Sequence, residues 1–148
     1  LSLHDALPIS LGVTGSSQGG ALSMVTAALD KRVTFYAAIH PAMCDHRAHL
    51  QKVAGGWPHY FYYFPTPTPQ RIQTADYYDM VNFARRITVP GWFSWGYNDD
   101  VCPPTSTYAA YNSITAPKEL HPYLETGHYW YQEQYEQWSQ WLWAQMGL

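Results

Sequence analysis

The stretch LGVTGSSQGGALSMVTAALD, residues 11–30, decides the fold. A short apolar segment leads into a Gly-rich turn, and residues 18–29 then carry small and apolar side chains at helical spacing before the charged DKR. This order predicts a buried strand, a sharp turn and a helix that Asp30 caps or ends. Residues 15–19 fit the pattern G-x-S-x-G, in which small residues on both sides of a serine permit the strained turn that exposes its hydroxyl.

The serine at the centre of this pattern is Ser17, and we predict that it is a nucleophile. The alternatives are that Ser16 acts instead, or that the Gly-rich turn is only structural. The backbone N–H of Gln18 lies at the expected start of the helix, where it can donate to an oxyanion. The sequence therefore predicts an acyl-transfer site at this turn.

The rest of the chain continues to alternate between strand and helix patterns. Strands are expected at residues 33–40, 91–97 and 118–125, and helices at 75–87, 105–114 and 135–146. Residues 43–73 are rich in aromatic residues, Gly and Pro, which predicts a long insertion outside the sheet. Strands separated by helices indicate the α/β class, with a mostly parallel sheet and helices on both faces.

A serine nucleophile needs a base, and the base needs an orienting carboxylate. In α/β-hydrolases these residues follow later strands in the order Ser, Asp, His. His128, in a Gly-His turn after the last expected strand, is the predicted base. Asp99 and Asp100 both follow the third expected strand; Asp99 is the preferred acid from its position two residues past Tyr97, and Asp100 stays open as the alternative.

The other histidines have weaker patterns. His40 ends an expected strand but precedes the acid position, so we expect a hydrogen-bonded core or pocket-wall residue. Three histidines in the insertion lack metal-ligand spacing of the HExxH kind and are expected to be solvated: His46, His49 and His59. The sequence thus predicts no metal site and no cofactor.

Composition limits the other possibilities. With 148 residues, of which 47% are hydrophobic, the chain can bury the core of one domain. Its net charge of −3 comes without a basic run, which argues against nucleic acid or an anionic membrane surface as a partner. No apolar run approaches the roughly 18 residues of a membrane span. Cys44 and Cys102 are expected to be buried free thiols.

Several blocks together resemble the acetyl xylan esterase and cephalosporin-C deacetylase family of α/β-hydrolases. They are GSSQGG from residue 15, HPAMCDHR from residue 40, and the strongest, D-x-V-C-P-P-x-[ST], at residues 99–106. The resemblance runs from about Gly12 to His128. It implies that Ser17 is the nucleophile, His128 the base and Asp99, rather than Asp100, the acid.

The resemblance also implies a substrate and an assembly. The expected reaction is removal of acetyl groups from acetylated sugars by an acyl-enzyme mechanism. In the family, the insertion mediates association into a ring-like hexamer, so we expect a homo-oligomer. The resemblance favours a cytoplasmic enzyme.

The position of Ser17, with only sixteen residues before it, needs an explanation. The first nine residues, LSLHDALPI, match the translation of a widely used sequencing adapter, so residues 1–9 are expected to be an artefact and residues 10–148 the C-terminal part of a hydrolase domain. In this fold several strands precede the nucleophile, and their loops supply the second oxyanion donor. We therefore expect the printed chain alone to fold poorly and to be inactive.

Two alternatives remain open from the sequence. One keeps the hydrolase fold but changes the substrate, as in a dienelactone-hydrolase-like esterase or an oligopeptidase-type peptidase. The other is a non-catalytic carbohydrate-binding module whose aromatic side chains stack on sugar faces: Trp57, Tyr60, Tyr62 and Tyr63. Packing in a core or interface is the commoner fate of such residues.

Overall fold

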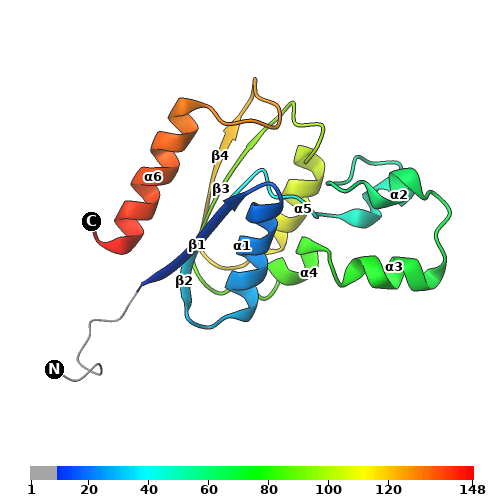
Figure 1. Ribbon diagram of the computed structural model, residues 1–148, viewed down its shortest axis with the longest axis horizontal. Helices are drawn as coiled ribbons and strands as arrows, with labels where there is room; N and C mark the ends of the chain where they lie inside the picture. The colour runs from blue at the N-terminus through cyan, green and yellow to red at the C-terminus, as the bar shows by residue number, and fades with distance from the viewer. Residues whose placement is uncertain (1–9) are drawn as a thin grey trace.

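A four-stranded parallel sheet organises the molecule (Figure 1). The structure is a computed structural model that describes residues 10–148; the predicted adapter segment, residues 1–9, lies outside the described residues. The strands lie side by side in chain order: β1 (Leu11–Ser16), β2 (Val33–Ile39), β3 (Gly91–Gly96) and β4 (Lys118–Tyr123). Because all four run in the same direction, their carboxyl ends meet at one edge, and the predicted α/β class is confirmed.

Helices cover both faces of this sheet. One face carries three of them, namely α1 (Gln18–Leu29), α4 (Met80–Ala84) and α5 (Pro104–Ser113), whereas α6 (Gln132–Met146) lies on the other (Figure 1). Helical crossovers between parallel strands produce this arrangement. The predicted two-sided covering of the sheet is thus confirmed.

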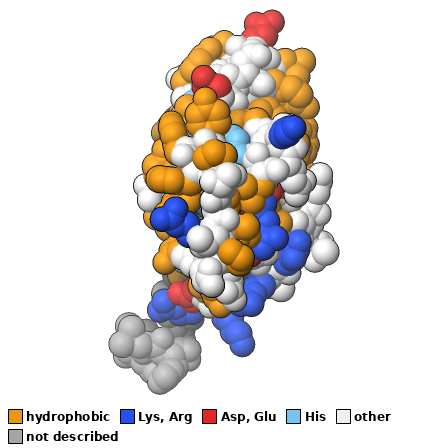
Figure 2. All heavy atoms as spheres, turned by 90° about the vertical axis from the view of Figure 1, so that its right-hand side faces the viewer, with side chains coloured by type: hydrophobic (Ala, Val, Ile, Leu, Met, Phe, Trp, Pro, Cys, Tyr) orange, Lys and Arg blue, Asp and Glu red, His pale blue; other side chains and the backbone are white. Residues whose placement is uncertain are grey.

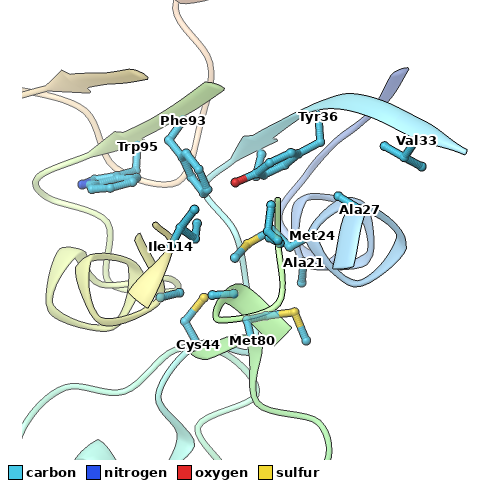
Figure 3. Close-up of a cluster of buried hydrophobic side chains, with 14 residues drawn as sticks. Ala21, Met24, Ala27, Val33, Tyr36, Cys44, Met80, Phe93, Trp95 and Ile114 are labelled. Atoms are coloured by element: carbon cyan, nitrogen blue, oxygen red, sulfur yellow. The ribbon is translucent and has the colours of Figure 1, made fainter. Parts of the chain in front are cut away.

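The larger core lies between the sheet and α1, α4 and α5 (Figure 3). Tyr36 of β2 meets Phe93 of β3 edge to face, with ring centroids 5.6 Å apart, and Met24 of α1 packs below them. Trp95 continues the row along β3 and is fully buried. Residues at every second strand position thus supply this face, as the pleat requires.

The alternate strand positions form a second core against α6. Phe35 of β2 and Trp92 of β3 are buried there with Trp141 of α6, and the Phe35 and Trp141 rings meet at 5.9 Å. The central strands β2 and β3 are therefore buried on both sides, which explains their nearly continuous apolar sequences.

Residues 43–79, here called the excursion, leave the sheet between β2 and α4. They contain η2 (His46–Gln51), α2 (Tyr60–Tyr63) and α3 (Pro69–Asp76), which lie to the right of the sheet in Figure 1. The backbone of Met43 closes the base of this segment, because its N–H donates to Trp57 and its C=O accepts from Met80, both at 2.8 Å.

The single helix expected at 75–87 is wrong. The structure has two helices there, because α3 ends at Asp76 and α4 begins at Met80. Asp79, in extended conformation between them, caps α4 by accepting from the Val81 N–H at 2.9 Å. Its carboxylate also accepts the N–H groups of Asp45 and His46, so it ties the start of the excursion to the start of α4.

The other expected elements agree with the structure to within three residues at each end. The largest difference is at α6, which begins at Gln132 rather than at residue 135. Asp30 caps the C-terminus of α1, as expected. None of the helices in the described part of the chain combines the length and apolarity required to cross a bilayer.

Candidate active site

Ser17 occupies a sharp turn between β1 and α1. Its backbone has φ 56° and ψ −121°, a conformation that is costly for a residue with a side chain and that persists only where the surroundings enforce it. The enforcing contacts are two backbone hydrogen bonds: its N–H donates to Ile39 at 2.8 Å, and its C=O accepts from Ala42 at 3.0 Å. The turn after β1 is thus held by the end of β2.

The glycines around Ser17 allow the helix to approach the strands. A Cβ on Gly15 would lie 2.4 Å from the backbone of Gly19, and a Cβ on Gly20 would lie 2.9 Å from the Ile39 carbonyl oxygen. Both distances are shorter than real side chains tolerate. A Cβ on Gly19 would meet nothing within 4 Å. The close approach therefore requires a glycine at residue 15 but not at residue 19.

Three side chains form a continuous hydrogen-bonded chain at the carboxyl edge of the sheet. His128 Nδ1 lies 2.7 Å from Asp99 Oδ2, and His128 Nε2 lies 3.0 Å from Ser17 Oγ. The tautomer that fits donates Nδ1–H to the carboxylate and leaves Nε2 to accept the serine O–H. The structure therefore brings together the three residues predicted as nucleophile, base and acid.

Asp99 is held by its own loop. Its Oδ1 accepts the backbone N–H groups of Val101 at 3.0 Å and Cys102 at 2.7 Å, and its side chain is fully buried. Asp100, the alternative acid, is exposed and makes no contact with His128 among the described hydrogen bonds. Asp99 is therefore the carboxylate that meets the imidazole.

The turn that carries His128 is pressed against the end of β3. A Cβ on Gly96 would lie 2.2 Å from the Thr126 carbonyl oxygen, and the Asn98 N–H donates to that same oxygen at 2.9 Å. On the other side, Trp130 Nε1 donates to Ser16 Oγ at 3.2 Å. The hydroxyl of Ser16 is thus occupied by a structural bond and does not face His128.

His40 lies behind this chain of residues. It is 1% exposed, its Nδ1 is 3.6 Å from Asp99 Oδ2, and its ring centroid is 5.3 Å from that of His128. Of the two predicted positions, core or pocket wall, the buried core position agrees with the structure. The expected hydrogen bond is wrong, because neither ring nitrogen has a partner among residues 10–148. Burial lowers the pKa of His40 to about 4, so the ring is neutral at neutral pH.

The solvated positions expected for the excursion histidines are also wrong. His46 is buried, and burial lowers its pKa; its backbone N–H donates to Asp79, a long-range contact that the sequence did not suggest. His49 and His59 are half-buried and pack against each other, with ring centroids 5.6 Å apart. Cys44 and Cys102 are buried free thiols, as predicted.

A cleft of about 630 Å³ opens beside the turn. Gln18, the residue after Ser17, forms part of its wall, and Arg71 is the one Lys or Arg among its lining residues. Aromatic side chains of the excursion line much of the remainder: Trp57, Tyr60, Phe61, Phe64 and Tyr78. The sequence indicated the aromatic character of this segment but not which of its residues share a wall with Gln18.

The backbone N–H of Gln18 is free to meet a ligand. Gln18 is the first residue of α1, and the first N–H groups of a helix have no acceptor within it. The partial positive charge of the helix N-terminus adds to this donor. The site thus combines a hydroxyl, an imidazole and a carboxylate joined by hydrogen bonds with a backbone N–H that has no acceptor within its helix.

Comparison with known proteins identifies the family. The family model for acetyl xylan esterase (AXE1) matches residues 3–145. The chain belongs to the acetyl xylan esterase family. Within the curated proteins, acetyl esterase Axe7A of Xylanibacter ruminicola is 54% identical over 118 residues, which cover 80% of this chain and 27% of that protein.

Solved structures of the acetyl xylan esterase family share the fold. The enzyme from Paenibacillus sp. R4 superposes with a TM-score of 0.78 at 30% identity, over 90% of this chain and 44% of that one. Acetyl xylan esterase 1 from Thermoanaerobacterium sp. JW/SL YS485 superposes with a TM-score of 0.77 at 29% identity, over 93% of this chain and 46% of that one. The chain therefore spans less than half the length of these relatives. A Pyrococcus horikoshii acylaminoacyl peptidase, at 11% identity and a TM-score of 0.66, shares the fold alone.

Proposed function

We propose that this chain carries the nucleophile, base and acid of a serine esterase that removes acetyl groups from acetylated sugars. The observation that carries the proposal is the hydrogen-bonded order Ser17, His128, Asp99, with separations of 3.0 and 2.7 Å. A hydroxyl, an imidazole and a buried carboxylate in this order are the components of nucleophilic acyl transfer.

In the first half of the reaction, Ser17 Oγ attacks the ester carbonyl carbon while His128 Nε2 takes the hydroxyl proton. The carbonyl π electrons move to oxygen, and the backbone N–H of Gln18 donates to that oxyanion. Asp99 stabilises the imidazolium that forms and fixes its ring. The imidazolium then gives its proton to the departing sugar oxygen, the C–O bond breaks, and an acetyl group remains on Ser17.

In the second half, water enters and the same residues act in reverse. His128 Nε2 takes a proton from water, the hydroxide attacks the acetyl carbonyl, and Ser17 leaves as its oxygen takes the proton back. Acetate and free enzyme result. The 24% exposure of the His128 side chain gives water a route to this nitrogen.

The sugar part of the substrate is supported by the family and by the cleft. The Axe7A relative is an acetyl esterase by name, and the solved relatives are acetyl xylan esterases. Aromatic rings such as those of Trp57 and Tyr60, which line the cleft beside Gln18, offer flat apolar faces of the kind that pack against sugar rings. We place the leaving sugar in this cleft.

Ser17→Ala tests the mechanism in the complete gene product that contains this chain. We expect the rate of acetyl release to fall by roughly 10⁴-fold or more, with the far-ultraviolet circular dichroism unchanged. Ser16→Ala is the matched control and should retain most of the rate, because that hydroxyl only accepts from Trp130. When the unchanged protein is quenched with acid during turnover, mass spectrometry should find an acetyl group on the peptide that contains Ser17. An alanine variant with most of its rate intact would reject the assignment.

A substrate panel separates the alternatives. Acetylated xylo-oligosaccharides, a dienelactone and a peptide p-nitroanilide are offered to the same preparation. Faster turnover of the lactone or the peptide would replace the proposed substrate but keep the mechanism. Sugar binding that survives Ser17→Ala, without turnover of any ester by the unchanged protein, would favour a binding module. A cytoplasmic location and a homo-oligomer, both suggested by the family resemblance, stay predictions.

A further inference from the structure

His40 has no part in the proposed ester hydrolysis, although it lies directly against the residues that perform it. Its side chain is buried and both ring nitrogens lack partners in the part of the chain that the structure describes; leaving such groups unpaired is costly. The ring faces Asp99 and His128, with Trp130 beside it at 6.4 Å between centroids. No lysine, arginine or second carboxylate forms an ion pair with it within residues 10–148.

The donor atoms of His40, Asp99 and His128 all lie within 4.8 Å of one another. In a tetrahedral zinc site, Zn–N and Zn–O distances of about 2.1 Å put neighbouring ligand atoms roughly 3.4 Å apart. The 3.6 Å between His40 Nδ1 and Asp99 Oδ2 is already close to that ligand–ligand distance. The 2.7 Å between His128 and Asp99 must widen, by a rotation of the partly exposed His128 ring, and the two histidine nitrogens, within 4.8 Å of each other, must reach the same spacing.

We infer that these three residues form an inhibitory site for Zn²⁺. Two imidazoles and one carboxylate are a ligand set that zinc takes, with a water as the usual fourth ligand, and the 24% exposure of the His128 side chain puts one ligand in contact with solvent. Neither ring nitrogen of His40 has a hydrogen-bond partner among residues 10–148, so a ring-nitrogen lone pair is available to a metal.

Binding moves one proton within His128. The Nδ1–H proton transfers through solvent to Nε2, the freed Nδ1 lone pair forms a bond to Zn²⁺, and Asp99 Oδ2 binds the metal in place of that hydrogen bond. Nε2 then carries a hydrogen and has no lone pair with which to take the Ser17 proton. Ser17 loses its base, so ester hydrolysis stops without any covalent change.

The first measurement is direct binding, which does not depend on activity. Cobalt(II), the spectroscopic substitute for zinc, is titrated into the Ser17→Ala variant of the complete gene product. We expect the visible absorption bands of a tetrahedral complex, displaced by Zn²⁺ and not by Mg²⁺, a hard cation that prefers oxygen ligands. A protein that binds no metal in this assay overturns the inference, whether or not it is an esterase.

The second measurement locates the site. His40→Asn suits the left-handed backbone at residue 40, where φ is 41°. We expect this variant to need at least about tenfold more Zn²⁺ than the protein with His40 for the same displacement of cobalt. The Zn²⁺ concentration that halves its own metal-free rate should rise by the same factor. His59→Asn is the matched control, because φ there is 55° and His59 forms the His49 pair. An effect of His59→Asn in place of His40→Asn, or equal Zn²⁺ sensitivity in all three proteins, would overturn the site.

Discussion

Asp99 divides its two carboxylate oxygens between its own loop and His128. Oδ1 accepts two backbone N–H groups of residues 101 and 102, and Oδ2 accepts His128 Nδ1–H at 2.7 Å. These loop hydrogen bonds orient the carboxylate independently of its hydrogen bond to His128. The orientation of the imidazole toward Ser17 therefore derives from the backbone of the segment that follows β3.

Asp99→Asn should remove most activity while leaving the fold intact. The amide oxygen can still accept the loop N–H groups, but an amide toward His128 favours the wrong tautomer, so we expect a loss on the order of 10⁴ in kcat. Asp100→Asn removes an equal charge from an exposed neighbour and should change kcat by less than about twofold. Steady-state kinetics on both variants make the comparison; similar losses from the two would contradict the assignment of the acid.

Gly15→Ala should destabilise the protein far more than Gly19→Ala. The new methyl at residue 15 would lie 2.4 Å from backbone atoms that cannot rotate away, so we expect a loss of about 3 kcal/mol or more in the free energy of unfolding. At residue 19 the methyl enters open space within α1, where replacing Gly stabilises by roughly 0.5–1 kcal/mol. Urea unfolding of the two variants, in the complete gene product, decides between these directions. Equal midpoints would show that the close approach of β1 and α1 is not maintained in solution.

Stability should fall as the pH drops from about 6.5 toward 4. The pKa of His40 is lowered to about 4 in the folded protein, whereas an unfolded histidine keeps its ordinary value near 6.5. Between pH 6.5 and pH 4 this histidine is protonated in the unfolded chain but not in the folded protein, so lowering the pH favours unfolding. Burial of His46 acts in the same direction.

His40→Asn should make this pH dependence shallower, by on the order of 2 kcal/mol between about pH 6.5 and 5. The measurement is the free energy of unfolding of the unchanged protein and of the variant at both pH values. A His40→Asn variant with the slope of the unchanged protein would show that this ring is not held neutral by burial.

The exposed aromatic side chains of the excursion are expected to form an interface between copies of the protein. Tyr62, Tyr63 and Phe64 are each more than half exposed, and apolar side chains spread across this end of the molecule in Figure 2. Light scattering should find an oligomer, and Tyr62→Ser combined with Tyr63→Ser should shift it toward monomer. A monomeric complete gene product with the excursion protected from protease would contradict this expectation.

The elements next to Ser17 were predictable because local rules determine them. The G-x-S-x-G pattern, the small residues of α1 and the charged DKR gave a helix at 18–29, which is where the structure has it. The meeting of residues after β1, β3 and β4 was predictable for a different reason: in a parallel sheet the carboxyl ends share one edge.

The missed features depend on contacts between distant segments. The break between α3 and α4 follows from Asp79, whose carboxylate caps α4 and also holds the backbone of Asp45 and His46, more than thirty residues earlier. The approach of His40 to Asp99 is likewise a tertiary contact across β2 and β3. Periodicity within a short window carries no information on either of these contacts.

The excursion is bonded to the loop that holds Asp99 as well as closed at its own base. Trp57, whose carbonyl oxygen accepts from Met43, donates its own N–H to the Val101 carbonyl oxygen at 2.9 Å. The Val101 N–H in turn donates to Asp99 Oδ1 at 3.0 Å. An exchange of residues within the excursion therefore alters two things together: the wall of the cleft beside Gln18 and the backbone that orients Asp99.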